Sequence, residues 1–504
     1  MSSRSFHFGA FALCVASLAA VSSCGSNEAP KKNVILIVVD TMRADRASLY
    51  GYERETTPRI SAWAERGAVF ERALAPSSWT VPSMGMLLTG QYRVVDGKAL
   101  DDEATPLSAT LTREGYRTIG IVANPVLNKL QGFTSGYESY DLILGKQDMS
   151  DPLHPGSWTT PFVVKKALRW LKEERDERPF MLYLHLMDPH FPYEPDEPDA
   201  FDWRGARSKK RRQGYDEALA LTNEAPLNDF QYQNLERLQA AYDAEILQVD
   251  SGLGVLFDYL DKSGLSDSSI VVLTADHGEG LWQRPTADGW INEGPLEGQL
   301  VSKLYRGHGE HLYDELLHVP LVLRGPGVEE GLRHKQPVSL VDVVPTLLSL
   351  LDISPPVELH GEPLLSKESP QLASRDHFSI CSRGMSITEE GRWKLHLPNA
   401  RIIARGAEPV LFDLKEDPLE QTPIKDEAIK ARLTAKLAAW TSRYEREVEA
   451  LSIDEQRQLL LQMGYVGLAE DLTEEMTDEE KQRRFKLEKD QRKANSSQDS
   501  TQEN

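Results

Sequence analysis

Three short segments of this 504-residue chain hold residue types that could together cleave an ester. Asp40 directly follows an apolar run, and the neighbours Asp276 and His277 follow another. Carboxylate and imidazole groups are ordinary ligands of divalent cations such as zinc and manganese. The third segment carries Thr80, whose hydroxyl group is a candidate nucleophile because a bound metal ion lowers the pKa of an alcohol. Each segment alone also fits a turn or a helix cap, so it is their combination that predicts a metal-dependent site.

The residues around Thr80 predict the start of a helix. Pro82 suits the first helical position, and Gly90 suits the residue that ends a helix. The free backbone N–H groups and the dipole at a helix N-terminus favour an anion. A hydroxyl group at this point would face a negatively charged substrate, whereas the alternative interpretation is a capping threonine.

Five apolar runs predict the strands of a central sheet. They are Asn33–Val39, Arg117–Ala123, Phe180–Leu186, Ser269–Thr274 and Val319–Leu323. Continuous apolar runs are typical of parallel strands that are buried on both faces. Helical patterns lie between or after them, at Ser61–Gly67, Phe162–Lys172, Leu235–Leu260 and Ser339–Leu351. This alternation predicts a doubly wound, mostly parallel α/β sheet, and ligands bind such sheets beyond the carboxyl ends of the strands.

The chain divides into five predicted sections. They are a lipoprotein-type signal peptide (1–24), a tether (25–32), a catalytic domain (33–370), a smaller C-terminal α+β subdomain (371–468) and a disordered charged tail (469–504). The subdomain is expected to contain short antiparallel strands and a closing helix. The expected elements are His377–Cys381, Arg392–Leu397, Val410–Asp413 and the helix Lys425–Glu445. Two insertions, Asp196–Pro226 and Trp282–Arg306, are expected to be surface loops.

The N-terminus has the pattern of an export signal. Arg4 precedes an apolar stretch, and Val21-Ser22-Ser23-Cys24 resembles a bacterial lipobox. We therefore expect an exported protein that a lipid at Cys24 anchors to a membrane, facing the periplasm or the cell surface. The alternative is an ordinary cleaved signal and free release. The formal net charge of −21 disfavours a nucleic-acid partner, which needs a basic surface.

Several longer motifs stand in the order seen in the sulfatase family, which belongs to the alkaline-phosphatase superfamily. They are DTMRAD (40–45), TTPRI (56–60), SSWTVPSMGMLLTG (77–90), HLMDPHFPY (185–193), TADHGE (274–279) and HGEHLYDELLHVPLVLRGPG (308–327). VSLVDVVPTLL (338–348), GRWKLHLP (391–398) and LFDLKEDPLE (411–420) resemble its C-terminal parts. The resemblance covers roughly residues 33 to 467, and so many ordered matches rarely arise by chance.

This resemblance implies roles for particular residues. Asp40, Asp276 and His277 would hold one divalent metal ion, and Thr80 would contact the metal and act as the nucleophile. The metal could be manganese, zinc, calcium or magnesium. The substrate-facing residue would be His190.

The proton donor to the leaving group would be His308 or His311, and the sequence does not choose between them. Asn124 is a weaker candidate for a substrate contact. A second metal ion is not expected, because Asp188 and His190 lack the Asp-x-x-x-His spacing of two-metal relatives.

Four positions depart from the family pattern. True sulfatases carry Cys or Ser where this chain has Thr80, and Arg where it has Met84, and the Cys or Ser is converted to formylglycine. Thr41 replaces a second Asp, and Asn124-Pro125-Val126 replaces a Lys-x-His motif. A formylglycine hydrate releases sulfate by breaking its own C–O bond, whereas a threonine sulfate has no such exit. Water can attack the phosphorus of a threonine phosphate in line, so phosphate or phosphonate esters are the favoured substrates.

Three other functions stay open at this stage. They are a sulfatase that works without formylglycine, a phosphotransferase, and a surface lipoprotein that binds glycans without cleaving them. The expected partner is an anionic ester, either on a glycan or on a lipid headgroup. The leaving group and the oligomeric state cannot be read from the sequence.

Overall fold

A computed structural model describes residues 30–93, 100, 104–143, 159–193, 195, 228–287, 290–291, 299–365 and 374–444. The predicted signal peptide with Cys24, the expected loop 196–226 and the predicted tail 469–504 lie outside the described residues. The chain forms two units, Met1–Lys31 and Lys32–Asn504, and the fold described here belongs to the second.

The main domain is built on an eight-stranded sheet with the order β13-β2-β12-β7-β1-β6-β4-β5. The strands are β1 (Asn33–Val39), β2 (Ala68–Phe70), β4 (Arg117–Val122), β5 (Ser139–Leu142), β6 (Phe180–Leu186), β7 (Ser269–Thr274), β12 (Leu321–Arg324) and β13 (Leu332–His334). The pairs from β7 to β5 are parallel, whereas β12 runs antiparallel to both of its neighbours. Every side chain of β1, β6 and β7 is buried, which explains their continuous apolar sequences.

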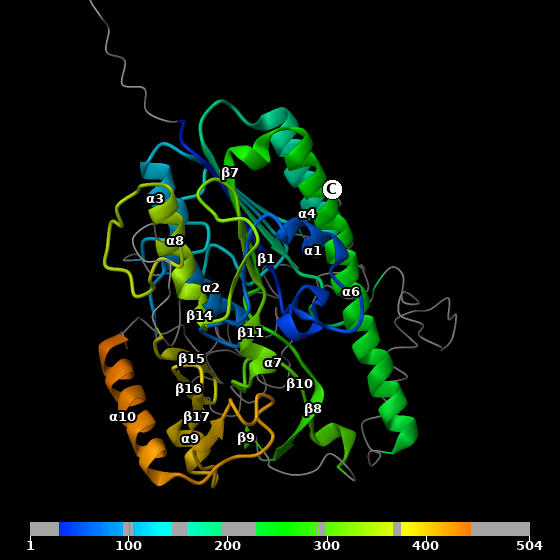
Figure 1. Ribbon diagram of the computed structural model, residues 1–504, viewed down its shortest axis with the longest axis vertical. Coiled ribbons are helices and arrows are strands. Elements are labelled where there is room, and N and C mark those ends of the chain that lie inside the picture. Colours follow the sequence, from blue (N-terminus) through cyan, green and yellow to red (C-terminus); the bar gives the residue numbers. More distant parts are fainter. Residues whose placement is uncertain are drawn as a thin grey trace, which may run out of the picture. The chain divides into compact units, whose positions relative to one another are not determined.

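Helices cover both faces of this sheet, as the sequence predicted (Figure 1). One group contains α1 (Pro58–Ala64), α4 (Thr160–Arg169) and the long α6 (Asp229–Lys262), and the other contains α2 (Thr80–Thr89), α3 (Leu107–Arg113) and α8 (Val343–Leu350). The doubly wound α/β fold class is therefore confirmed. Among the helices of the described ranges, none combines the length and the apolar character that crossing a bilayer requires.

The C-terminal subdomain is a four-stranded antiparallel sheet in the order β15-β16-β17-β18, with one long helix against it. Its elements are β15 (His377–Cys381), β16 (Gly384–Glu389), β17 (Trp393–Pro398), β18 (Val410–Asp413), the short α9 (Ala400–Ile403) and α10 (Glu427–Tyr444). Leu433 and Leu437 of α10 pack on Ile387 and Leu395 of the sheet. Ser379 joins the subdomain to the main domain, because its hydroxyl donates to the carbonyl of Ala75 at 2.8 Å.

The structure corrects three expectations about local structure. The segment Trp282–Arg306 is not simply a loop, because β8 (Gly280–Ala287) pairs with β9 (Trp290–Ile291) and with β10 (Leu304–Gly307) in a small antiparallel sheet. The expected strand Val319–Leu323 is two strands, since Pro320 separates β11 (His318–Val319) from β12. The strand β16 had not been expected at all.

Short elements complete the main domain. They are β3 (Ala73–Leu74) and β14 (Val338–Ser339), which form a small sheet with β11, the helix α7 (Asp314–Leu317), the 3-10 turns 44–46, 48–50, 265–267, 301–303 and 340–342, and the π turn 170–174.

Candidate functional site

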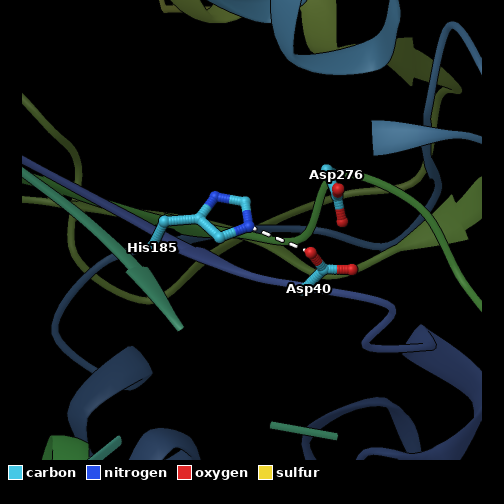
Figure 2. Close-up of side chains that lie close together, drawn as sticks. All are labelled: Asp40, His185 and Asp276. Carbon is cyan, nitrogen blue, oxygen red and sulfur yellow. Dashed lines mark hydrogen bonds and ion pairs between the residues drawn. The ribbon is translucent and has the colours of Figure 1, made fainter. Parts of the chain in front are cut away.

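Two buried carboxylates meet at the carboxyl ends of the central strands. Asp40 directly follows β1, and Asp276 lies two residues after β7, the strand that pairs with β1. On the other side of β1, the parallel register sets His185 of β6 opposite Val38. Figure 2 shows these three side chains directed toward one another, and their ligand atoms all lie within 4.8 Å of one another. This is the geometry expected of a site beyond the strand ends of an open α/β sheet.

The two oxygens of Asp40 have different surroundings. Oδ2 accepts hydrogen bonds from Nδ2 of Asn124 at 2.6 Å and from Nε2 of His185 at 3.1 Å. Oδ1 is buried and has no hydrogen-bond partner among the described residues. Burial opposes ionisation, but the hydrogen bond from His185 and the nearby His190 outweigh it and hold the pKa of Asp40 below its usual range.

The two carboxylate oxygens of Asp276 also differ in their surroundings. Its Oδ1 accepts from the backbone N–H of Thr41 at 3.2 Å and of His277 at 2.9 Å. Its Oδ2 accepts no hydrogen bond from the part of the chain that is described, and it lies 3.4 Å from Nε2 of His277. Burial, and next the negative charge of Asp40, raise the pKa of Asp276.

These carboxylates fit a divalent cation. Two buried, unpartnered oxygens from neighbouring carboxylates are costly in the absence of positive charge, and a divalent cation removes that cost. Asp40, Asp276 and His277 supply the oxygen and nitrogen ligands that such cations bind.

Thr80 is held by a metal-ligand candidate. The Nδ1 of His277 donates to the carbonyl of Gly278 at 2.9 Å, which leaves the lone pair on Nε2. Burial lowers the pKa of His277, so the imidazole is neutral. The hydroxyl of Thr80 lies 3.1 Å from Nε2 and donates to it. The predicted nucleophile and the predicted ligand therefore face the same point.

Helix α2 positions Thr80. Trp79 is the residue before the helix, so Thr80 is its first residue and Pro82 its third, two positions later than the sequence suggested. Gly90 ends the helix with a left-handed backbone (φ 66°), as expected. The hydroxyl of Ser83 donates to the carbonyl of Asp276 at 2.6 Å, which ties this helix to the end of β7.

A buried carboxylate supports one of the predicted histidines. Oε1 of Glu279 accepts a hydrogen bond from Nδ1 of His308 at 3.2 Å. Burial opposes ionisation of Glu279, but the charge of His308 and this hydrogen bond lower the pKa of Glu279. The ring of His308 lies 4.4 Å from that of His277 and 5.0 Å from that of His190. The structure thus brings His190 and His308 to the site.

His311 lies in different surroundings. Its ring packs 4.4 Å from that of Tyr305 and 6.3 Å from that of Tyr313. Burial and the positive charge of Arg383 lower the pKa of His311 well below its usual value. A histidine that stays neutral is a poor proton donor, so the geometry favours His308 for that role.

Two other predicted residues have structural partners. Asn124, the weaker candidate for a substrate contact, bonds to Asp40 instead. Asp188 accepts from the backbone N–H of Thr160 at 2.8 Å and from its hydroxyl at 2.6 Å, and so caps α4. This contact holds the segment that leads to His190, and it occupies a carboxylate that a second metal ion would need.

Comparison with known proteins agrees with the motifs. The sequence model of the family described as Sulfatase matches residues 32–353, more than half of the chain. The chain belongs to the sulfatase family. Sulfatases cleave ester bonds, and this chain is accordingly a hydrolase of ester bonds.

Several named sulfatases resemble the chain in sequence. An ulvan-active sulfatase of Formosa agariphila is 24% identical over 362 residues, which cover 67% of this chain and 65% of that protein. The chain thus matches slightly less than two thirds of that relative's length. Arylsulfatase K of Bos taurus is 25% identical and covers 78% of each chain. An N-acetylglucosamine-6-O-sulfatase of Bacteroides thetaiotaomicron is 21% identical, over 71% of this chain and 75% of its own length.

Solved structures show the same fold. A protein in complex with its substrate D-glucosamine-2-N,6-O-disulfate superposes with a TM-score of 0.63 at 18% identity, covering 82% of this chain and 98% of that one. A phosphonate monoester hydrolase of Agrobacterium radiobacter gives a TM-score of 0.60 at 20% identity, covering 82% of this chain and 96% of its own. At these identities the likeness establishes the fold alone.

Two residues of this sulfatase-family site were not assigned from the sequence. His185 contacts Asp40 and Glu279 contacts His308, yet neither had been given a role. A signal was present for His185, because it is the one imidazole in the otherwise apolar run FMLYLHL. Glu279 is the last residue of the TADHGE motif, but nothing in the sequence indicated its partner, which lies 29 residues later in the chain.

Proposed function

We propose that this protein hydrolyses a singly charged ester of a phosphorus or sulfur oxyacid, with phosphonate monoesters and phosphate diesters favoured, through nucleophilic attack by Thr80. The observation that carries the proposal is the 3.1 Å contact between the Thr80 hydroxyl and Nε2 of His277, beside unpartnered oxygens of Asp40 and Asp276. A nucleophile in this place, next to ligands that suit a cation, is an arrangement for ester cleavage.

The ligands would be Asp40, Asp276 and His277, with Thr80 beside them, and the ion would be manganese, zinc, calcium or magnesium. Bound there, a divalent cation supplies positive charge that lowers the pKa of a nearby hydroxyl group and stabilises negative charge on the transferred group.

The side chains then act in sequence. Thr80 reacts as the alkoxide, after losing its proton to solvent. Its oxygen forms a bond to phosphorus while the bond from phosphorus to the leaving oxygen breaks. His308 gives its proton to that oxygen, and Glu279 stabilises the protonated ring. Water then attacks phosphorus, breaks the bond to Thr80 and returns a proton to His308. His190, whose ring is 5.0 Å from that of His308, contacts the non-bridging oxygens.

The charge balance of the site favours a singly charged substrate. In the described part of the chain, no lysine or arginine side chain bonds to Asp40, Thr80 or Asp276. Met84 and Asn124 stand where sulfatases carry cations, and both are buried. One divalent cation offsets the two carboxylates, so a doubly charged phosphate monoester would bring two uncompensated charges into a buried site.

A second candidate is the hydrolysis of a sulfate monoester, which is also singly charged. The named relatives are sulfatases that act on ulvan or on N-acetylglucosamine 6-O-sulfate, and a sulfated glycan fits the same charge argument. A phosphotransferase would use an acceptor alcohol in place of water. A lipoprotein that only binds glycans would have no need of a nucleophile such as Thr80.

Export and anchoring belong to the same proposal. A lipid at Cys24 would hold the site at a membrane facing the periplasm or the cell surface, within reach of an anionic glycan or lipid headgroup. Cell fractionation of a Cys24→Ala variant tests this, since the variant should move from the membrane to the soluble fraction.

The decisive experiment compares matched substrates. Residues 25–504 would be purified, loaded with Mn²⁺ and given the same aryl group as a phosphate monoester, a phosphate diester, a phosphonate monoester and a sulfate ester. Thr80→Ala removes the nucleophile. Thr89→Ala is the matched control, because Thr89 is buried in the same helix and its hydroxyl bonds only to backbone carbonyl groups and the N–H of Gln91.

We expect turnover of the diester and the phosphonate monoester that Thr80→Ala abolishes and Thr89→Ala retains. Sulfate turnover alone would favour the second candidate. Equal turnover of the phosphate monoester would contradict the charge argument, and no turnover of any ester would favour the non-catalytic lipoprotein.

A further inference from the structure

Two side chains bind one oxygen of Asp40, and a third side chain supports one of them. We infer that Asn124 and His185 are positioning residues that bind Oδ2 of the Asp40 carboxylate and so aim Oδ1 at the cation, and that Tyr183 orients the His185 ring. This inference rests on the proposed function, in which Asp40 is a metal ligand. It gives Asn124 a role other than substrate contact, and it makes His185 a support for a ligand.

The direction of the hydrogen bonds follows from Asp40. A metal ligand is a carboxylate and can only accept, so Nε2 of His185 must carry the proton that it shares with Oδ2 at 3.1 Å. In the neutral ring, Nδ1 then accepts from the phenol O–H of Tyr183 at 2.9 Å. Both ring nitrogens are thus engaged. Tyr183 and His185 are fully or almost fully buried, so water does not compete for these contacts.

Asn124 approaches the same oxygen from another strand. Its Nδ2 lies 2.6 Å from Oδ2, while its Oδ1 accepts from the backbone N–H of Val126 at 3.0 Å. The second contact determines which end of the amide faces Asp40. The two donors therefore come from the ends of β4 and β6, the neighbours of β1 in the sheet.

The consequence is an asymmetric carboxylate. Oδ2 has two donors, and Oδ1 has no partner within the described ranges. A bare, oriented oxygen is ready to bind a cation without rearrangement. Contacts of this kind behind a ligand commonly change metal affinity by about 10- to 100-fold.

The competing interpretation makes His185 itself a ligand. Its ring nitrogen lies within 4.8 Å of ligand oxygens from Asp40 and Asp276, so proximity alone would allow it. The 3.1 Å contact between Nε2 and Oδ2 of Asp40 is the observation against it, because a carboxylate oxygen only accepts, and a nitrogen that carries a proton has no lone pair for a cation.

The test measures metal binding, which does not depend on turnover. Mn²⁺ titrations by calorimetry, on residues 25–504, would compare the wild type with Asn124→Ala, His185→Leu, His185→Gln and Tyr183→Phe. We expect the Kd for Mn²⁺ to rise about 10- to 100-fold in Asn124→Ala and His185→Leu. His185→Gln keeps an N–H that can reach Oδ2, so it should stay within about 5-fold of the wild type.

Matched controls come from neighbouring contacts. Asn128→Ala removes an amide of the same loop that donates to the carbonyl of Pro125, and Tyr140→Phe removes a phenol of β5 that donates to the carbonyl of Leu127. Neither should change the Kd. Saturating Mn²⁺ should restore kcat in the positioning variants, which a general loss of structure would not allow.

Pulsed EPR of bound Mn²⁺ separates the two interpretations of His185. Coupling to one imidazole nitrogen, which His277→Ala removes, is the expected result. Coupling to a second nitrogen that His185→Gln removes would overturn the inference, as would an unchanged Kd in both Asn124→Ala and His185→Leu. Circular dichroism shows which variants fold, and if His185→Leu does not, Asn124→Ala and His185→Gln still decide. Mn²⁺ binding without ester turnover would refute the proposed function only, whereas no Mn²⁺ binding by the wild type would refute both.

Discussion

The contact between Glu279 and His308 allows a prediction about the departure of the alcohol. Glu279→Gln keeps an oxygen that can accept from Nδ1 of His308 and keeps the side-chain volume, but it removes the negative charge. The proton on His308 then loses its nearest stabilising charge. If His308 protonates the leaving oxygen, the substitution will slow the reaction most for alcohols that are poor leaving groups.

The size of the effect follows from the 3.2 Å separation. Coulomb's law with an effective dielectric constant of about 20 gives about 5 kcal/mol for two unit charges this close, as an upper limit. Spreading of the charge over the carboxylate and the ring reduces this, and a loss of about 1.5 to 3 kcal/mol shifts a titration by about 1 to 2 pH units. We therefore expect the alkaline limb of the pH–rate profile to move down by about 1 to 2 pH units.

The assay uses a series of aryl esters whose phenols span several pKa units. Turnover of the 4-nitrophenyl ester should fall less than about 10-fold in Glu279→Gln, because nitrophenolate leaves without a proton, while the unsubstituted phenyl ester should lose about 100-fold or more. Glu420→Gln is a matched control. Glu420 is also buried and bonded to a histidine, His396 at 2.9 Å, but in the C-terminal subdomain.

Equal losses across the leaving-group series would refute the reasoning, because Glu279 would then serve the fold or the site as a whole. A leaving-group dependence in Glu279→Gln that stays as shallow as in the wild type, with little loss of turnover, would show that another group donates the proton. In either case Glu420→Gln should lower stability without a change in the slope of the series.

Three further predictions concern the framework of the site. Gly278→Ala should destabilise the protein and reduce turnover at least about 10-fold, since the Cβ of the alanine would lie 2.0 Å from the backbone oxygen of Glu315. Thermal melts measure the loss of stability and kcat measures the loss of turnover. An unchanged kcat would contradict the prediction. Lys394→Met should lower the free energy of unfolding by about 3 to 5 kcal/mol in urea titrations. The reason is that the fully buried ammonium group bonds to Asp314 at 2.7 Å and to Glu420 at 2.9 Å. A loss below about 1 kcal/mol would show that these ion pairs contribute little net stability. Burial opposes the ionisation of Asp314 and Glu420, but neighbouring cations lower the pKa of both. The free energy of unfolding should therefore be at its full value above about pH 4 and should fall as the pH is lowered further. A pH profile of Lys394→Met parallel to that of the wild type would show that Asp314 and Glu420 do not cause the loss.

The strands that carry the site could be predicted because burial on both faces leaves a clear sequence pattern. The bounds of β1, β6 and β7 agree with the apolar runs residue for residue. Asp40 and Asp276 are polar residues that end such runs, so their convergence followed from the rule for parallel sheets. The pairing of β8 with β10 could not be predicted, since β10 is short, both strands contain polar residues without a clear alternation, and a long segment joins them.

The contacts that orient the site could not be predicted from the sequence. The contact of His185 with Asp40 depends on the register of β6 against β1, in which Val38 lies opposite His185. A shift of one residue would turn the imidazole to the other face of the sheet, and the apolar pattern of FMLYLHL does not exclude that shift. The preference for His308 over His311 likewise depends on the partner that each one reaches, Glu279 or Tyr305.

Three departures from the sulfatase pattern, at Thr80, Met84 and Asn124, have a common consequence for the charge of the site. Thr80 cannot become formylglycine, and the position that would carry the modification arginine holds Met84, which is fully buried in the core. Asn124, in place of a lysine, gives a neutral donor to Asp40 where a cation would pair with it. With neither cation present, the proposed metal ion would supply the positive charge beside Thr80. Under the proposed function, such a site is better matched to an ester with one negative charge than to one with two, and Asn124→Lys should shift the preference toward the ester with two.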